Sequence, residues 1–127
     1  MTHNTVMIVD DSKMDLMLNQ IILETEKFAQ NILSFSSSPE AINYLTEADQ
    51  GKNIFPEVIF LDLNMPVFTG FDVLNKFEGY TSDESKNCKI YVLSSSDDED
   101  DFERLKSYKN FVGYLSKPLN SSEIFKK

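Results

Sequence analysis

Five short apolar runs alternate along the chain with segments whose apolar residues recur at helical spacing. The apolar runs lie at about 5–9, 31–35, 57–61, 89–93 and 111–115. The helical segments lie at 12–27, 38–49, 69–78, 98–107 and 120–126. Near-continuous apolar strands joined by helices are typical of a parallel sheet that helices cover on both faces, and right-handed crossovers leave few topologies for it. The alternation therefore predicts an α/β fold of the (βα)5 type, a doubly wound, flavodoxin-like, five-stranded parallel sheet of order 2-1-3-4-5.

Length, charge and cysteine content exclude several classes of protein. A chain of 127 residues without linker or repeat predicts one domain over 1–127, with no second domain visible. The net charge of −9 argues against direct nucleic-acid binding, which needs basic clusters. Cys88 has no partner for an internal disulfide, which fits a reducing compartment. No signal peptide and no membrane span are recognisable, so we expect a cytoplasmic protein that binds no membrane.

Capping signals mark the starts of three helical segments. Ser12 and Thr69 are each followed three residues later by an aspartate, Asp15 and Asp72, as in a capping box. Ser38 precedes a proline, the order expected of a cap and a first helical residue. We therefore expect these three side chains to hold the first turns of their helices.

Two further expectations concern packing and a connection. The first helical segment shows one apolar stripe, which predicts the face that packs on the sheet. The stripe consists of Met14, Met17, Leu18, Ile21 and Ile22. The segment 79–88 is polar and begins with a glycine, so we expect a surface loop there.

Polar residues follow four of the five apolar runs, at the point where each predicted strand ends. These residues are Asp10-Asp11, Asp62, Ser94 and Lys117-Pro118. Carboxyl ends of parallel strands share one edge of a sheet, and ligands bind there at the point where the strand order reverses. The reversal lies between the strands that end at Asp10-Asp11 and at Asp62. We therefore expect residues more than 100 positions apart to converge on one site.

The side chains at this edge suit phosphoryl chemistry around a divalent metal. Two like charges 4 Å apart repel by about 4 kcal/mol at an effective dielectric constant of 20, and Lys117 offsets only one of the three carboxylates. Mg²⁺ removes the remaining conflict, because it prefers carboxylate, carbonyl and phosphate oxygens. Asp62 stands alone on its strand and is the best candidate nucleophile, since carboxylates can form aspartyl phosphates. Lys117 would hold one phosphate oxygen, and the Ser94 hydroxyl would donate to another.

Taken together, the motifs of the chain resemble one family. They are VDD at 9–11, LDLNMP at 61–66 followed by Gly70, LSS at 93–95 and SKP at 116–118. In this combination the chain resembles the receiver domain of two-component response regulators, the chemotaxis-regulator-like phosphoacceptors. The resemblance covers essentially the whole chain.

The resemblance implies a role for each matching position. Asp62 matches the phosphorylated aspartate, while Ser94 and Lys117 match the switch hydroxyl and the invariant lysine. The implied Mg²⁺ site consists of Asp10, Asp11, Asp62 and the backbone carbonyl of Asn64. Tyr114 matches the aromatic switch position, and the Lys117–Pro118 peptide bond matches one that is typically cis in the family.

The resemblance also implies partners and a mechanism. A sensor histidine kinase or a histidine phosphotransfer protein would present phosphohistidine to Asp62. The face formed by 98–107, 111–115 and 120–126 would then change its affinity for a downstream protein target, which the sequence does not name. Such a protein is a regulatory phosphoacceptor that assists its own phosphorylation and dephosphorylation, not a conventional enzyme.

Three other functions compete with this interpretation. A phosphatase of the haloacid-dehalogenase type also uses an aspartate nucleophile and Mg²⁺, but it expects a second aspartate where Asn64 stands. A flavodoxin-like electron carrier needs a phosphate-binding loop rich in hydroxyl groups and glycine, whereas the sequence DDSKMD after the first strand is acidic. A pseudo-receiver that only binds partner proteins is the third alternative.

Overall fold

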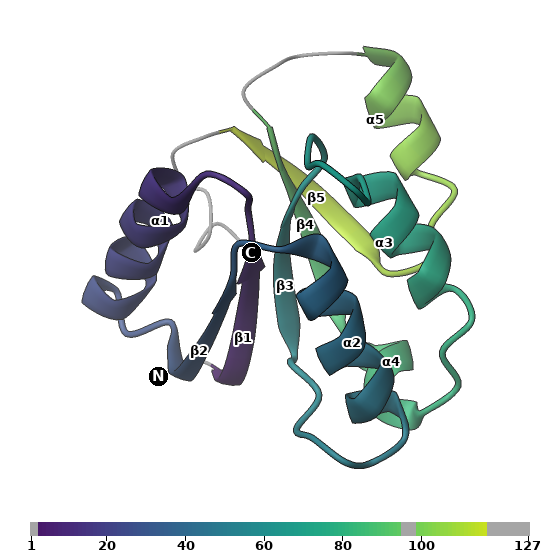
Figure 1. Ribbon diagram of the computed structural model, residues 1–127, viewed down its shortest axis with the longest axis horizontal. Helices are drawn as coiled ribbons and strands as arrows, with labels where there is room; N and C mark the ends of the chain where they lie inside the picture. The colour runs from purple at the N-terminus through teal and green to yellow at the C-terminus, as the bar shows by residue number, and fades with distance from the viewer. Residues whose placement is uncertain (1–2, 95–98, 117–127) are drawn as a thin grey trace.

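A computed structural model of the chain describes residues 3–94 and 99–116. The strands are β1 (His3–Val9), β2 (Ala29–Phe35), β3 (Val58–Asp62), β4 (Lys89–Ser94) and β5 (Phe111–Ser116). The helices are α1 (Lys13–Thr25), α2 (Ser38–Asp49), α3 (Gly70–Phe77), α4 (Asp83–Asn87) and α5 (Glu99–Leu105). The strands form one parallel sheet of order β2-β1-β3-β4-β5 (Figure 1), which confirms the predicted topology.

The central strands are buried on both faces of the sheet. Because side chains alternate along a strand, β1 sends Met7 and Val9 into one apolar cluster and Val6 and Ile8 into another. All five residues of β3 are buried. This two-sided burial explains why the strands read as continuous apolar runs rather than as alternating ones.

Helices lie on both faces of the sheet (Figure 1). On one face α2, α3 and α5 contribute Leu45, Leu74 and Leu105, which are fully buried with the Met7 cluster. On the other face α1 contributes Leu23 to the cluster around Phe60. Among the residues that the structure describes, no helix is long and apolar enough to cross a membrane.

The inward face of α1 differs from the predicted one. Met14, Met17, Leu18 and Ile21 are 69%, 59%, 45% and 50% exposed. The helix turns a second stripe towards the sheet, in which Asn19 and Leu23 are buried and Leu16 is partly buried. Only Ile22 of the predicted stripe packs against the core. The buried asparagine interrupts the apolar pattern of the true inward face, so the outer stripe gives the stronger signal.

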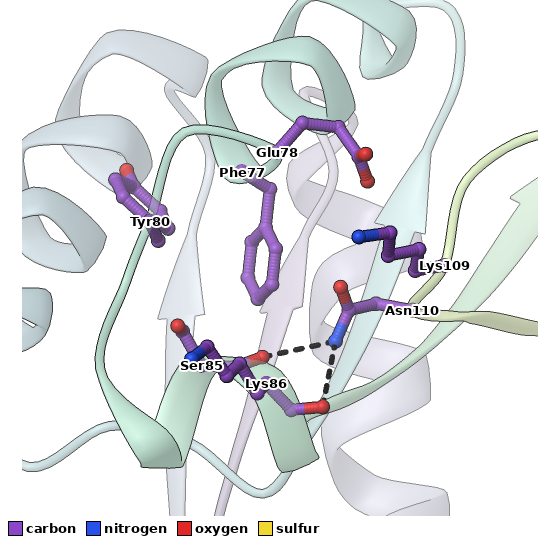
Figure 2. A pocket seen from close by; sticks show the side chains of 7 residues that line it. All are labelled: Phe77, Glu78, Tyr80, Ser85, Lys86, Lys109 and Asn110. Carbon is purple, nitrogen blue, oxygen red and sulfur yellow. Dashed lines mark hydrogen bonds between the residues drawn. The ribbon is translucent and has the colours of Figure 1, made fainter.

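The predicted loop 79–88 contains the short helix α4, so that expectation was wrong. Ser82 caps its start by accepting a hydrogen bond from the Ser85 N–H at 3.1 Å. At its other end the Asn110 side chain donates to the carbonyl groups of Ser85 and Cys88, at 2.9 and 2.7 Å (Figure 2 shows the first). The five residues of α4 are all polar, so the sequence shows no apolar helical pattern there. Part of the capping comes from Asn110, which is distant in the sequence.

A cavity of about 130 Å³ lies beside this junction (Figure 2). Phe77, Lys109 and Asn110 are among the residues that line it. Because β4 and β5 both begin next to it, the cavity lies at the edge of the sheet opposite the strand ends that carry the predicted site.

Two of the three predicted caps are confirmed, and the third is displaced by one residue. Ser12 accepts from the Asp15 N–H at 3.2 Å, and Thr69 forms a full capping box with its partner three residues on. In α2, however, Ser37 is the cap and accepts from the N–H of Glu40. Ser38 is the first helical residue, and its hydroxyl makes other bonds that are described below.

Candidate functional site

The ends of β1 and β3 bring three carboxylates together. Val9 pairs with Leu61 in the sheet, so the residues that follow them, Asp10 and Asp62, lie side by side at the carboxyl edge. Asp11 is the next residue of the chain. One carboxylate oxygen from each of the three aspartates lies within 4.8 Å of the others. The three aspartates expected at this edge therefore lie together.

Backbone N–H groups orient two of these carboxylates. Asp10 accepts from the Ser12 N–H at 3.0 Å, and its own N–H donates to the Phe35 carbonyl at the end of β2. Asp62 accepts from the Asn64 N–H at 3.2 Å. In both cases an aspartate bonds the backbone two residues further on, as in an Asx turn. The carboxylates are thus held in place before any ligand arrives.

Burial makes the cluster a candidate cation site. Asp10 and Asp62 are 0% and 3% exposed, whereas Asp11 is exposed. Buried charges are stable when they are paired or bind a metal, and like charges this close repel each other. Three converging carboxylate oxygens are hard ligands of the kind that Mg²⁺ accepts. The donor set therefore fits a divalent cation, with Asp11 on the side that faces solvent.

The loop between β3 and α3, residues 63–69, follows Asp62 directly. Gly70 begins α3, and its N–H donates to the Leu63 carbonyl at 2.8 Å. A Cβ atom at Gly70 would lie 2.6 Å from the Asp62 carbonyl oxygen and 2.7 Å from the Leu63 Cα. Glycine is required here because the helix begins in contact with the strand backbone. Asn64, whose carbonyl is the predicted metal ligand, lies exposed in this loop.

Several predicted site residues lie wholly or partly outside the described residues. Ser94 ends β4 and pairs with Ser116 of β5, which places its backbone at the carboxyl edge, but its side chain is not described. Lys117 and Pro118 fall outside the described residues, as does the predicted helix 120–126. Their roles stay predictions.

Tyr114 lies on β5 beneath α5. Its ring is partly buried and meets the ring of Phe102 edge to face, with centroids 6.1 Å apart. Phe102 also meets Phe111 edge to face at 6.3 Å. The predicted aromatic switch position thus belongs to an aromatic contact between β5 and α5.

Sequence reasoning missed two residues beside the site. Ser38 bonds the loop that carries Asn64, and Val67 in that loop has a positive φ of 67°. Three serines, 36–38, precede the proline, and Glu40 lies three residues after Ser37, which is the capping signal that would have identified Ser37 as the cap. A β-branched residue gives no signal at all for a left-handed backbone, which it adopts rarely.

Comparison with known proteins gives the family. Residues 6–127 match the response regulator receiver domain family. Response regulator Rcp1 of Synechocystis is 31% identical over 95% of this chain and 81% of its own. A two-component response regulator from Cytophaga hutchinsonii has a TM-score of 0.86 and 28% identity over 97% of this chain and 92% of its own.

Two further solved structures have ligands or modifications in their names. The phosphorylated cyanobacterial phytochrome response regulator RcpA has a TM-score of 0.77 and 28% identity, over 98% of this chain and 87% of its own. The Mn²⁺-bound form of a response regulator Rcp1 has a TM-score of 0.74 and 27% identity, over 97% and 87%. With the fold and the acidic cluster described above, these matches show that the chain belongs to the response regulator receiver domain family, a class of regulatory signalling modules.

Proposed function

We propose that this receiver domain is a phosphoacceptor switch in which Asp62 takes a phosphoryl group from a histidine kinase or a histidine phosphotransfer protein. The observation that carries the proposal is the gathering of the Asp10, Asp11 and Asp62 carboxylates within 4.8 Å at one edge of the sheet. Phosphorylation of the neighbour RcpA and Mn²⁺ binding by the neighbour Rcp1 support it.

In the proposed reaction an Asp62 carboxylate oxygen attacks the phosphorus of phosphohistidine. The O–P bond forms as the N–P bond breaks, and the imidazole leaves on the donor protein. The Asn64 N–H fixes the plane of the carboxylate through its 3.2 Å hydrogen bond, which presents the nucleophile in one orientation.

The metal site of the proposal uses Asp10, Asp11, Asp62 and the carbonyl of Asn64. When bound, Mg²⁺ supplies positive charge that offsets the carboxylates and the phosphoryl oxygens. Asp10 and Asp62 hold their ligand atoms rigidly because both are buried and bonded to backbone N–H groups. Lys117 and the Ser94 hydroxyl complete the proposal as phosphate partners, by the family resemblance.

The proposed output surface combines α5, β5 and the segment 120–126. Ser94 would move towards the phosphoryl group, and Tyr114 would turn with it, which changes the Tyr114–Phe102 contact between β5 and α5. Reversing a two-state equilibrium from 1:99 to 99:1 requires about 5.5 kcal/mol. Charge-assisted hydrogen bonds from Ser94 and Lys117 are the strong kind of contact that this requires.

The test is labelling by a small phosphodonor such as acetyl phosphate, with Mg²⁺ or with EDTA. We expect wild type to gain one phosphoryl group only with Mg²⁺, and the Asp62→Asn variant to gain none. The matched control is Asp83→Asn, which removes an exposed carboxylate in α4 and leaves labelling unchanged.

Other outcomes separate the alternatives. Steady hydrolysis of added phosphoesters would favour a haloacid-dehalogenase-type phosphatase. Partner binding by a wild-type protein that never labels would favour the pseudo-receiver.

A further inference from the structure

Ser38 connects the start of α2 to the loop that follows Asp62. Its side chain is buried, with 2% exposure. The hydroxyl donates to the Pro66 carbonyl at 3.2 Å and accepts from the Phe68 N–H at 3.3 Å. It takes no part in capping α2, because Ser37 does that. A buried hydroxyl therefore satisfies backbone groups on both sides of a single residue, Val67.

Val67 lies between the two groups that Ser38 bonds and has a strained backbone conformation. Its φ is 67°, and the Phe68 N–H also donates to the Pro66 carbonyl at 2.8 Å, which closes a γ-turn around it. A γ-turn with positive φ is the rare, strained form, and a β-branched residue is ill suited to it. The Val67 side chain is 78% exposed, so its own packing does not hold the turn. Strained conformations persist where surrounding contacts determine them, and Ser38 supplies such contacts.

The same loop follows the proposed phosphoacceptor directly in the chain. Asn64 bonds Asp62, and Gly70 closes the base of the loop on Leu63. The connection that ends in Ser38 also reaches the other side of the site, because the Phe35 carbonyl accepts from the Asp10 N–H at 3.1 Å. The end of β2 and the start of α2 thus bond the backbone of Asp10 and the loop that follows Asp62.

We propose that Ser38 is a positioning residue for the phosphoacceptor site. Its hydroxyl holds the strained turn at Val67, and through that turn it holds Asn64 in the place where its carbonyl meets a divalent cation. This inference rests on the proposed function. It adds that the requirement for Mg²⁺ depends on a side chain that touches neither the cation nor the phosphoryl group.

The adjacent serines provide a matched pair of variants. Ser37→Ala removes the cap of α2 and leaves the loop contacts intact, whereas Ser38→Ala removes the loop contacts and leaves the cap. Each variant loses one hydroxyl group, and the two positions are adjacent in the chain. Urea unfolding establishes that each variant is folded under the conditions of the assay. A role in general stability predicts similar effects from both.

Three measurements on the full chain test the proposal. We expect Ser38→Ala to raise the Mg²⁺ concentration for half-maximal labelling by about fivefold, the loss expected from one buried hydrogen-bonding group. A Mg²⁺ titration followed by the Asn64 amide signal should show the same shift in affinity without any phosphodonor. Amide hydrogen exchange over 64–69 should become faster. Ser37→Ala should match wild type in all three.

The outcomes separate this inference from the proposed function. If wild type labels and Ser38→Ala shows the same Mg²⁺ dependence, the positioning role is overturned and the phosphoacceptor stands. Equal shifts in Ser37→Ala and Ser38→Ala, or unchanged exchange in the loop, would also overturn it. If wild type neither labels nor binds Mg²⁺, the proposed function fails first, and the inference fails with it.

Discussion

Asp62 and Asp49 lie near opposite edges of the same sheet, and each carboxylate accepts hydrogen bonds from backbone N–H groups. Asp49, at the end of α2, accepts from Thr81 and Ser82 at 3.2 and 2.9 Å and joins α2 to the connection before α4. Asp62 accepts from the N–H of Asn64, which lies two residues further along the chain. It also shares its surroundings with two further carboxylates. An aspartate therefore links two segments of the fold at one edge, as Asp49, and belongs to a cluster of carboxylates at the other, as Asp62.

Other residues at the two edges differ in the same way: those near Asp49 form favourable packing and hydrogen bonds, and those near Asp62 include unfavourable features. Near Asp49, the rings of Phe55, Phe77 and Tyr80 pack with centroids 5.3 to 6.3 Å apart, and Asn110 satisfies the carbonyl groups that end α4. The carboxylate edge instead holds buried like charges and the strained γ-turn at Val67. Functional sites commonly contain such unfavourable features, which the rest of the fold must offset. Here the offsetting contacts are the ring packing and hydrogen bonds at the edge that holds Asp49, together with the two apolar clusters.

The largest effect that we expect on stability comes from adding one methyl group to the carboxylate edge. Gly70→Ala would place a Cβ within 2.7 Å of backbone atoms of Asp62 and Leu63, which cannot move aside as a flexible side chain would. We expect the free energy of unfolding in urea to fall by about 3 kcal/mol. The control is Gly79→Ala, where the nearest atom is 3.5 Å away and the change should stay within about 1 kcal/mol. Equal effects at the two glycines would show that the close contact at α3 does not constrain this edge.

A smaller effect is expected at the opposite edge, where hydrogen bonds rather than close contacts matter. Asn110→Ala would remove the side-chain donor to the carbonyl groups of Ser85 and Cys88, although the Ser85 carbonyl also accepts from the Cys88 N–H at 3.3 Å. We expect a loss of about 1–2 kcal/mol in unfolding free energy with no change in Mg²⁺-dependent labelling. Asn87→Ala, which removes an exposed contact within α4, should cost less than about 0.5 kcal/mol. Loss of labelling in folded Asn110→Ala protein would mean that the two edges are coupled.

The contrast between the edges also explains which features were predictable from sequence. The strand order and the convergence of the aspartates follow from two general rules, the two-sided burial of parallel strands and the shared edge of their carboxyl ends. Both rules act through patterns that are local in the sequence. Asp10 and Asp62 could therefore be placed together although 52 positions separate them in the numbering.

The features that were missed depend on tertiary contacts. The inward face of α1 includes Asn19, a polar residue that the fold buries against expectation. The short helix α4 forms where Asn110 caps it from a remote segment. The Ser37 cap has a local signal, because Glu40 lies three residues on. The bonds from Ser38 to the loop around Val67 join residues about 30 positions apart and have no local signature, and neither does the contact from Asn110.

The smallest predicted effect concerns the stability of the protein at alkaline pH. It tests whether the phenol of Tyr80, at the edge that holds Asp49, contributes to that stability. Burial, reinforced by the negative charge of Asp49 and partly opposed by a hydrogen bond with Thr46, raises the pKa of Tyr80 above its ordinary value. The folded protein therefore binds the phenol proton more tightly than the unfolded chain. The resulting stability is fully present below about pH 10, the ordinary tyrosine pKa, and is lost as the pH rises through the raised pKa.

We therefore expect the unfolding free energy of wild type to fall above about pH 10. In Tyr80→Phe the total fall should be smaller by less than about 1 kcal/mol, because the Tyr80 ring is only partly shielded from solvent. The comparison uses slopes against pH, since the variant also loses its bond to Thr46 at every pH. Burial also raises the pKa of Tyr44 and Tyr91, so some slope should remain. Asp49→Asn should flatten the curve in the same direction, because it removes the charge that helps to keep the phenol protonated. Parallel curves for wild type and Tyr80→Phe would mean that Tyr80 does not contribute to the alkaline loss of stability.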